Sequence, residues 1–548
     1  MRSGASSPNN SNASRRTERN ATRHTPADRR HLPGSTLTRP EFAGARGDCY
    51  HIAAHERAGD MVDNEQDRAG TAPHVVIVGG GITGVTAAFY LRNEPVRITL
   101  LEAAPRLGGK LSASEVAGVL VDEGAEGLYA RRPKTTRLLT AAGLGDQLAL
   151  AGATTTAIWS RGALRPLPAS QFMGIPADLD ALADSGILSP GGVAAARRDL
   201  GLPPTERDGD VTVAAYVSQR LGQEVLDRLV DPFLSDVCAG RSDQLSFEAM
   251  LAPLANAARR YPSLIQAAGS LVPPPPPDGQ EPPTGIGTLT GGLGNLPQVL
   301  VDAVLADSPD ARVRTGAEVT GLAPERQGWR LTVNADAGTE QLTADAVIVA
   351  VPAGPAGRLL AGVPGVAPAA AELAQLPYAS VGSITLAYPR TAFAGGLATR
   401  GFCGYRVPAV DGRAVNEVTF STVKWPHLAG EVEILRCSVG KVGDEAALHR
   451  DDADLVRLVT AEVAAATGAN GVPVATRVTR WPSALPQYTV GHLNRVNRIR
   501  TAVGGSPGLA VCGAAYEGVG VGTCIADAQK AVDQVLTGLP GTTPAALS

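Results

Sequence analysis

The stretch from His74 to Glu102, HVVIVGGGITGVTAAFYLRNEPVRITLLE, constrains the fold of this chain more than any other. The apolar run HVVIV predicts a buried strand, TGVTAAFYLRN has the spacing of a helix, and VRITLL predicts a second buried strand. Gly79-x-Gly81-x-x-Gly84 joins the first strand to the helix, and Glu102 ends the second strand. This order of strand, glycine turn, helix and acidic residue is the fingerprint of a dinucleotide-binding βαβ unit.

The fingerprint also predicts which parts of a dinucleotide are bound here. The helix N-terminus is expected to hold the pyrophosphate, and the Glu102 carboxylate is expected to hold the ribose hydroxyls. An acidic residue at this position repels a 2′-phosphate, which disfavours NADP. A glycine turn in an unrelated βαβ unit is the alternative, and the choice between NAD and FAD depends on later residues.

Composition limits the class of protein. A chain of 548 residues is long enough for two or three domains, and 44% hydrophobic with 19% charged residues is typical of a globular protein. The sequence has no uninterrupted apolar run of about 18 residues, so a membrane-spanning helix is not expected. Its six cysteines form no CxxC pair, which favours reduced thiols in the cytoplasm over a metal site or a disulfide framework.

Residues 1–60 differ from the rest of the chain. They contain ten Arg, no Lys, three Asp and three Glu and so carry a charge of +4, whereas the whole chain carries −4. Without apolar periodicity this segment is expected to be disordered. A nucleic-acid-binding tail and a transit peptide are possible interpretations. The preferred one is a dispensable extension, because the sequence from Met61 resembles the start of an ordinary enzyme.

Two motifs after the βαβ unit favour FAD. Residues 102–110, EAAPRLGGK, resemble the R-x-G-G-K/R motif of the flavin amine oxidase superfamily, in which this turn lies along the FAD. Residues 121–132, VDEGAEGLYARR, resemble the D-x-G-A/P segment of the same superfamily, which runs beside the flavin. Three motifs in the expected order within about 55 residues disfavour an interpretation as unrelated loops.

The C-terminal blocks are more specific. TRWPSALPQYTVGHLNRV (479–496) and CGAAYEGVGVG (512–522) resemble the oxygen-dependent protoporphyrinogen/coproporphyrinogen oxidases, most of all the Gram-positive coproporphyrinogen III oxidases. KWPH (424–427), FMGIP (172–176) and LVDPFLSDVCAGRSDQLS (229–246) are similar to the same family. The resemblance covers residues 73–538 apart from the proline-rich insertion.

The resemblance implies an α/β (α+β) fold in which a Rossmann-like FAD-binding domain is assembled from discontinuous segments. A mixed-sheet substrate domain and a helical subdomain complete it. The expected organisation is a disordered basic extension (1–72), a first FAD-binding segment (73–135), a mainly helical subdomain (136–283) with a proline-rich insertion (272–283), a second FAD-binding segment (284–352), a substrate-binding domain (353–478), a third FAD-binding segment (479–538) and a flexible tail (539–548).

The resemblance also implies a six-electron oxidation of coproporphyrinogen III to coproporphyrin III in haem biosynthesis, with O₂ as acceptor and H₂O₂ as product. The flavin performs the chemistry, so no catalytic residue and no metal ligand is assigned. FAD is expected to bind non-covalently. The expected FAD contacts are Gly79, Gly80, Gly81, Ile82, Thr83, Gly84, Glu102, Ala103, Arg106, Gly108, Gly109, Lys110, Gly124, Ala125, Glu126, Gly127, Val319, Trp481, Val519, Gly520, Val521 and Gly522.

Porphyrinogen propionates need cationic partners, and Arg binds carboxylates bidentately. Arg132, and after it Arg131, are the candidates, with solvated surface arginines as the alternative. Gly174 and Ile175 are candidates for shaping the ring pocket. His492 is interpreted as a structural hydrogen-bonding residue instead of a base.

Cys512 is interpreted as a buried small residue instead of a covalent flavin link. Ferrochelatase is a possible partner, nucleic acid is not expected, and membrane contact is peripheral at most.

Three alternatives stay open. Protoporphyrinogen IX is the second substrate candidate, because the motifs do not separate it from coproporphyrinogen III. Amine oxidation or carotenoid desaturation is disfavoured, because CGAAYEG replaces the usual G-E-x-T of amine oxidases. A non-catalytic FAD-binding protein with the same fold is disfavoured by the intact glycine loops and the intact LPQYTVGH block.

Overall fold

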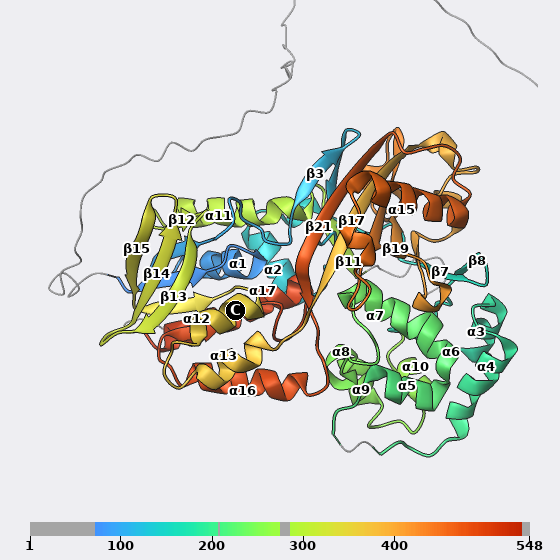
Figure 1. The fold of residues 1–548 in the computed structure, drawn as a ribbon, viewed down its shortest axis with the longest axis horizontal. Coiled ribbons are helices and arrows are strands. Elements are labelled where there is room, and N and C mark those ends of the chain that lie inside the picture. The colour runs from blue at the N-terminus through green and yellow to red at the C-terminus, as the bar shows by residue number, and fades with distance from the viewer. Residues whose placement is uncertain (1–71, 207–208, 274–284, 540–548) are drawn as a thin grey trace, which may run out of the picture. The chain divides into compact units, whose positions relative to one another are not determined.

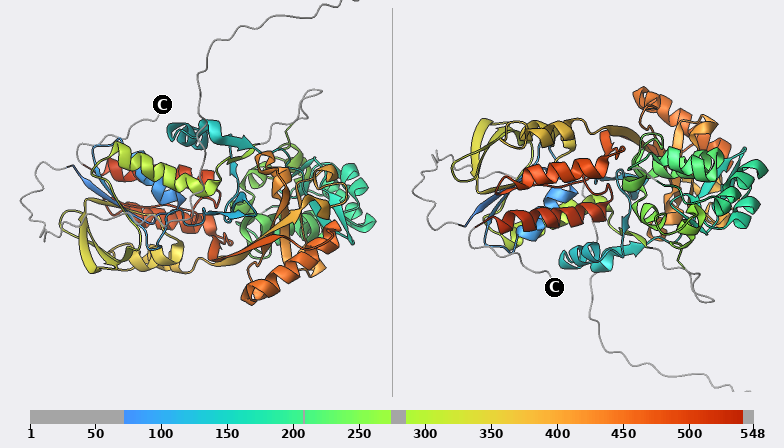
Figure 2. Two further views of the ribbon diagram at one scale, coloured as in Figure 1. Left: turned by 90° about the horizontal axis from the view of Figure 1, so that it is seen from above. Right: turned by 90° about the horizontal axis from the view of Figure 1, so that it is seen from below.

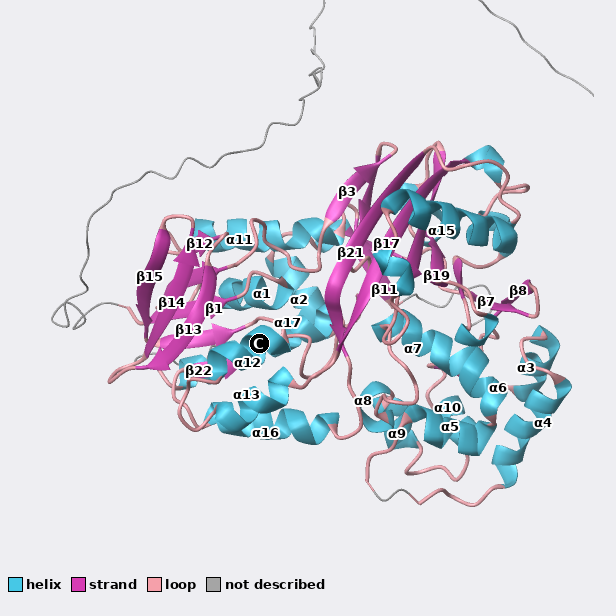
Figure 3. Ribbon diagram, viewed as in Figure 1, coloured by secondary structure: helices cyan, strands magenta, loops and turns pink. Residues whose placement is uncertain are grey.

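The first βαβ unit lies in a five-stranded sheet with the strand order β12-β2-β1-β16-β22 (Figures 1 and 3). The computed structural model describes residues 72–206, 209–273 and 285–539 of the chain. All the pairings in this sheet are parallel, so that Val75 lies beside Ala346 and Val349 lies beside Val511. The strands are β1 His74–Val78, β2 Arg97–Leu101, β12 Arg312–Arg314, β16 Ala346–Val349 and β22 Leu509–Val511.

Both faces of this sheet are buried, which is why its strands are continuous apolar runs. Val75 and Ile77 pack into one core with the helices that cover that face, where α1 contacts both α11 and α17 (Figure 2). Val76 and Val78 pack into a second core on the other face. The covering helices of the first face are α1 Ile82–Leu91, α11 Leu296–Asp307 and α17 Val521–Thr537.

The second face is covered by an antiparallel three-stranded sheet and three helices. The β-strands pair in the order β13-β14-β15, and α12 and α13 pack together with α16 against the same core. These elements are β13 Glu318–Pro324, β14 Trp329–Ala335, β15 Gly338–Ala344, α12 Ala353–Leu360, α13 Ala367–Ala374 and α16 His492–Gly504.

A seven-stranded mixed sheet with the order β21-β17-β20-β19-β18-β7-β8 takes most of its strands from residues 353–478, the segment predicted to be the substrate-binding domain. Its pairings are antiparallel except that between β18 and β7. The helix α15, Asp452–Thr467, packs against this sheet. The strands are β7 Ala157–Ser160, β8 Ala163–Pro166, β17 Tyr378–Pro389, β18 Gly404–Arg406, β19 Val415–Phe420, β20 Val432–Val439 and β21 Ala475–Pro486.

Smaller elements connect these sheets. They include a hairpin of β3 Ala113–Val116 and β4 Val119–Asp122, a sheet of β5 Leu128–Tyr129, β11 Ile286–Leu289 and β6 Leu148–Leu150, the pair β9 Gln171–Phe172 and β10 Ile175–Pro176, and the helices α2 Pro133–Ala141 and α14 Ser421–Lys424. The helical subdomain has its own core. Its helices are α3 Leu179–Ser185, α4 Pro190–Arg197, α5 Val213–Leu221, α6 Gln223–Val225, α7 Asp231–Cys238, α8 Phe247–Met250, α9 Ala252–Ala257 and α10 Leu264–Gly269.

The predicted fold class is confirmed: a parallel nucleotide-binding sheet built from distant segments, a mixed sheet and a helical subdomain. The segment boundaries differ from the predicted ones in three places. Residues 353–374 pack on the core of the parallel sheet, residues 479–486 extend the mixed sheet through β21, and residues 157–166 add β7 and β8 to it. Each difference arises because contacts with distant segments, and not the local sequence pattern, decide to which sheet or core these residues belong.

Some predicted features lie outside the described residues. These are the extension except residue 72, the tail from residue 540, and residues 274–283 of the proline-rich insertion. Across the three described ranges, no helix has both the length and the apolar character needed to cross a bilayer.

Candidate functional site

A cleft of about 380 Å³ lies at the carboxyl ends of β1, β2 and β16. This is the edge of a parallel α/β sheet at which ligands bind, because the loops that follow its strands meet there. The predicted residues that line it are Gly79, Gly81, Ile82, Thr83, Glu102, Ala103, Gly108, Gly109, Lys110, Ala125, Val319, Val519 and Val521. The other predicted FAD contacts are not among the residues that line this cleft.

The three fingerprint glycines have different roles. Gly79 has a φ of +109°, which an L side chain rarely adopts. A Cβ on Gly84 would lie 1.8 Å from the carbonyl oxygen of Gly79, so this glycine lets α1 pack against the turn. A Cβ on Gly81 would meet no atom within 4 Å, which leaves the cleft open at the first turn of α1. Helix α1 therefore presents its N-terminal N–H groups to the cleft.

The Glu102 carboxylate fixes the first loop as well as lining the cleft. Its Oε2 accepts a hydrogen bond from the backbone N–H of Gly80 at 2.6 Å, and its Oε1 accepts one from the N–H of Ala104 at 2.8 Å. Each oxygen keeps a second acceptor position. The side chain can therefore hold the loop and accept hydrogen bonds from ribose hydroxyls at the same time.

The turn after Glu102 is held by Arg106. Its guanidinium donates hydrogen bonds to the carbonyl oxygens of Leu107, Gly109 and Leu111. Arg106 therefore stabilises the turn without lining the cleft itself. Lys110 lines the cleft, and burial lowers the pKa of its amine. An anionic or acceptor-rich ligand would stabilise the charged form of Lys110.

The second glycine loop reaches the same cleft from the C-terminal end of the chain. It follows β22, and α17 begins at Val521 without a side-chain hydrogen bond from its N-cap, Gly520. The loop is tied to α17, because Asp527 accepts a hydrogen bond from the N–H of Gly513 at 2.9 Å and pairs with Arg500. Val519 and Val521 therefore offer a second helix N-terminus to the cleft.

His492 supports this second loop, in agreement with its interpretation as a structural residue. Its Nε2 lies 2.9 Å from the carbonyl oxygen of Tyr516, and its ring stacks on Tyr488 at a centroid distance of 3.9 Å. The Tyr488 hydroxyl donates to the carbonyl of Ala514, which lines the cleft. Burial lowers the pKa of His492 to about 4, so the neutral ring donates through Nε2.

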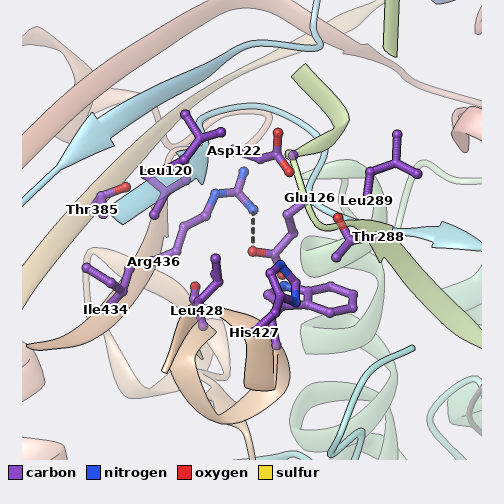
Figure 4. A pocket seen from close by; sticks show the side chains of 14 residues that line it. Leu120, Asp122, Glu126, Thr288, Leu289, Thr385, His427, Leu428, Ile434 and Arg436 are labelled. Carbon is purple, nitrogen blue, oxygen red and sulfur yellow. Dashed lines mark ion pairs between the residues drawn. The ribbon is translucent and has the colours of Figure 1, made fainter. Parts of the chain in front are cut away.

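Residues 122–127 are predicted to run beside the flavin, and we call them the flavin-lining segment. They contribute only Ala125 to the wall of this cleft. A Cβ on Gly124 would lie 1.9 Å from the Lys110 carbonyl oxygen, which requires glycine here. Glu126 points instead into a separate small cavity toward Arg436 (Figure 4). Burial raises the pKa of Glu126, but the Lys424 ammonium and the Arg436 guanidinium together hold it below its ordinary value.

Trp481 and Gly127 do not line the cleft either. The Trp481 indole donates a hydrogen bond to the carbonyl of Glu123 at 3.1 Å, and Gly127 packs near the ring of Trp425. Gly80 packs near Leu107, and Gly522 packs near Thr135 on α2. These contacts shape the loops that carry the lining residues.

The four predicted substrate residues fall into two groups. Arg131 and Arg132 are exposed, and Arg132 donates a hydrogen bond to Thr523 in the first turn of α17 at 2.8 Å. The fold thus brings Arg132 beside the second glycine loop. Ile175 is fully buried in the core of the helical subdomain, and Gly174 packs against the backbone of Leu229. The Ile175 side chain therefore faces core residues.

Sequence reasoning missed some of the wall. Ala350, Val351 and Pro352 follow β16, and the rule that ligands bind at the carboxyl ends of parallel strands identifies them once β16 is placed in the sheet. Tyr378 lines the cleft from β17, and its hydroxyl accepts a hydrogen bond from the N–H of Ala353. No local motif marks Tyr378, because its position depends on the packing of two domains.

Comparison with known proteins agrees with this geometry. The family of flavin containing amine oxidoreductases matches residues 82–536, and the family of pyridine nucleotide-disulphide oxidoreductases matches residues 33–125. A coproporphyrinogen III oxidase of Bacillus subtilis is 32% identical over 480 residues, which cover 85% of this chain and 98% of that protein.

Two further similarities extend over the same length. A coproporphyrinogen III oxidase of Mycobacterium tuberculosis is 36% identical over 469 residues, which cover 84% of this chain and 97% of that protein. A solved structure from Exiguobacterium, described as a protoporphyrinogen oxidase, has a TM-score of 0.73 and 29% identity and covers 85% of this chain and 99% of its own.

The fingerprint glycines can be separated by substitution. Gly84→Ala forces its Cβ into the Gly79 carbonyl, so we expect the flavin-free protein to lose about 1–3 kcal/mol of unfolding free energy, as for other overpacked sites. Gly81→Ala meets open space and should keep the unfolding free energy within about 0.5 kcal/mol but weaken flavin binding. Urea unfolding and flavin titration measure the two effects. Equal loss of stability in both variants would contradict these roles.

His492 makes stability depend on pH. Its pKa is about 4 in the folded protein against an ordinary value of 6.5, so the unfolded chain binds the proton more tightly. The stabilisation is complete above pH 6.5 and is lost as the pH falls toward 4. His492→Asn keeps a donor for Tyr516 without titrating, so between about pH 7 and 4.5 it should lose roughly 2 kcal/mol less than wild type. Identical pH profiles in urea unfolding would rule this out.

Proposed function

Because the chain belongs to the family of flavin containing amine oxidoreductases, we propose that it is an FAD-dependent oxidase that converts coproporphyrinogen III to coproporphyrin III. The observation that carries this proposal is similarity to coproporphyrinogen III oxidases along more than four fifths of the chain. The overall change removes six electrons and six hydrogens from the porphyrinogen, and three O₂ are reduced to three H₂O₂.

The residues of the cleft fit FAD. Two helix N-termini and the open position at Gly81 suit the pyrophosphate and the polar atoms of the ring, and Glu102 has acceptor positions for ribose hydroxyls. The backbone around Val319 in β13 is proposed to meet the adenine. When bound, FAD supplies the acceptance of electrons from the substrate and their transfer to O₂.

Non-covalent binding is supported by the state of the nearby cysteines. Cys512 is fully buried, and burial raises its pKa well above the ordinary value. Cys524 lines the cleft, and burial raises its pKa to about 11. Because the thiolate is the reactive form, both side chains are inert thiols near neutral pH. The described cysteines are free and buried, which fits the proposed cytoplasmic location.

Arg132 is the proposed anchor for a substrate propionate, with Arg131 beside it. The hydrogen bond to Thr523 places the Arg132 guanidinium at the start of α17, where the second glycine loop meets the cleft. A guanidinium has five N–H donors, so one bond to Thr523 leaves others for a carboxylate. The porphyrinogen is therefore proposed to enter from this side.

Protoporphyrinogen IX is the second candidate substrate, supported by the similarity to the Exiguobacterium structure. It carries two propionates where coproporphyrinogen III carries four. Purified enzyme in air should form porphyrin fluorescence and H₂O₂ faster than autoxidation, with a kcat/KM about tenfold or more higher for coproporphyrinogen III. A clearly higher kcat/KM for protoporphyrinogen IX would transfer the proposal to that substrate, and no oxidation of either would reject it.

The role of Arg132 has a separate test. Loss of one charged hydrogen bond costs about 1.5–3 kcal/mol, so Arg132→Ala should raise the KM for coproporphyrinogen III roughly tenfold or more with unchanged flavin content. The KM of Arg132→Lys should lie between those of wild type and Arg132→Ala. Arg457→Ala on the exposed face of α15 is the matched control. Unchanged kinetics in Arg132→Ala would show that this residue is a solvated surface arginine and does not bind the substrate.

A further inference from the structure

The flavin-lining segment is attached to the parallel-sheet domain along one side. The N–H of Glu123 donates to the Ser112 carbonyl at 2.8 Å, and the N–H of Ala125 donates to the Lys110 carbonyl at 3.3 Å. At its start, the Asp122 carboxylate accepts hydrogen bonds from the N–H groups of Leu293 and Gly294. Because Ala125 and Lys110 both line the cleft, this side of the segment forms a stretch of the flavin-binding wall.

The mixed sheet of the substrate domain holds the other side of the same segment. Arg436 on β20 donates hydrogen bonds to the carbonyl oxygens of Glu123 and Gly124. Trp481 on β21 donates to the Glu123 carbonyl as well. Three side-chain hydrogen bonds thus end on two consecutive carbonyls of the segment, next to the residue that reaches the cleft.

Glu126 makes two ion pairs with residues of the mixed-sheet region. One carboxylate oxygen lies 2.6 Å from the Lys424 ammonium at the end of α14, and the other lies 3.6 Å from Arg436. The exposed fractions of the three side chains are only 12%, 19% and 25%. Burial lowers the pKa of Lys424, but the carboxyl groups of Glu126, Glu417 and Asp236, with Glu126 the largest contributor, raise it above the ordinary value, so Lys424 is charged. Screening by water is weak at this depth.

Figure 4 shows two side chains of the segment, those of Asp122 and Glu126. Glu126 and Arg436 point toward each other across a small cavity, and Asp122 approaches the same cavity from the start of the segment. Ala125, one residue before Glu126, faces the cleft instead. Glu126 is therefore bonded directly to the residue whose backbone reaches the cleft.

We propose that Glu126, through its ion pairs with Lys424 and Arg436, is a positioning residue that fixes the flavin-lining segment from the substrate side and thereby sets the affinity for the flavin. The side chain acts through the backbone of Ala125 and does not contact the flavin itself. This inference rests on the flavin binding of the proposed function and is independent of which porphyrinogen is oxidised.

The test is flavin affinity and local backbone exchange in variants of the whole chain. FAD is titrated into flavin-free protein by fluorescence, and amide hydrogen exchange is followed over residues 122–127. Glu126→Gln and Lys424→Met should raise the Kd for FAD about tenfold and speed exchange in this segment, whereas Lys424→Arg should restore both. Asp454→Asn, which removes an exposed ion pair on α15, is the control and should match wild type.

The variants separate positioning from simple stability. Lys424→Met keeps the Glu126–Arg436 pair and should fold even where Glu126→Gln does not. Folded variants with a lower melting temperature but an unchanged Kd and unchanged exchange at 122–127 would overturn the inference alone. Wild-type protein that binds no FAD would overturn the proposed function, and this inference with it.

Discussion

Parallel pairing of β1 with β16, and of β16 with β22, is the constraint on which the cleft depends. Parallel neighbours need long crossover connections, so this sheet is completed by segments far apart in the sequence. The first glycine loop follows β1 and the second follows β22, and both therefore leave the same edge of the sheet. Two helix N-termini, those of α1 and α17, therefore face the same cleft.

The features that sequence predicted are those specified by local pattern. The apolar strands, the glycine spacing and Glu102 lie within 30 residues and predict the βαβ unit, which lies in the five-stranded parallel sheet. The fold class implied by the family resemblance is also confirmed. The resemblance based on YEGVG and LPQYTVGH is confirmed by the family match and the full-length relatives. The structure requires glycine at two positions of this pattern, because Gly79 has a positive φ and a Cβ on Gly84 would clash with the Gly79 carbonyl oxygen.

The features that sequence did not predict depend on contacts between distant residues. The direction of the Glu126 side chain is set by its ion pairs with Lys424 and Arg436. No motif near Glu126 in the sequence predicts these partners. Arg106 belongs to a motif, but its guanidinium donates hydrogen bonds to backbone carbonyl oxygens of its own turn. Ile175 is an apolar residue that is buried in the core. A short apolar stretch has the same sequence pattern in a core and in a pocket wall, so the sequence did not distinguish these two places.

The two glycine loops are proposed to hold one non-covalent FAD, and the direct measurement is release of the cofactor from purified protein. We expect a yellow protein whose colour passes entirely into the supernatant after acid precipitation, with the mass and absorption spectrum of FAD. A colourless protein that FAD does not reconstitute, or a flavin that stays with the precipitated chain, would contradict this mode of binding.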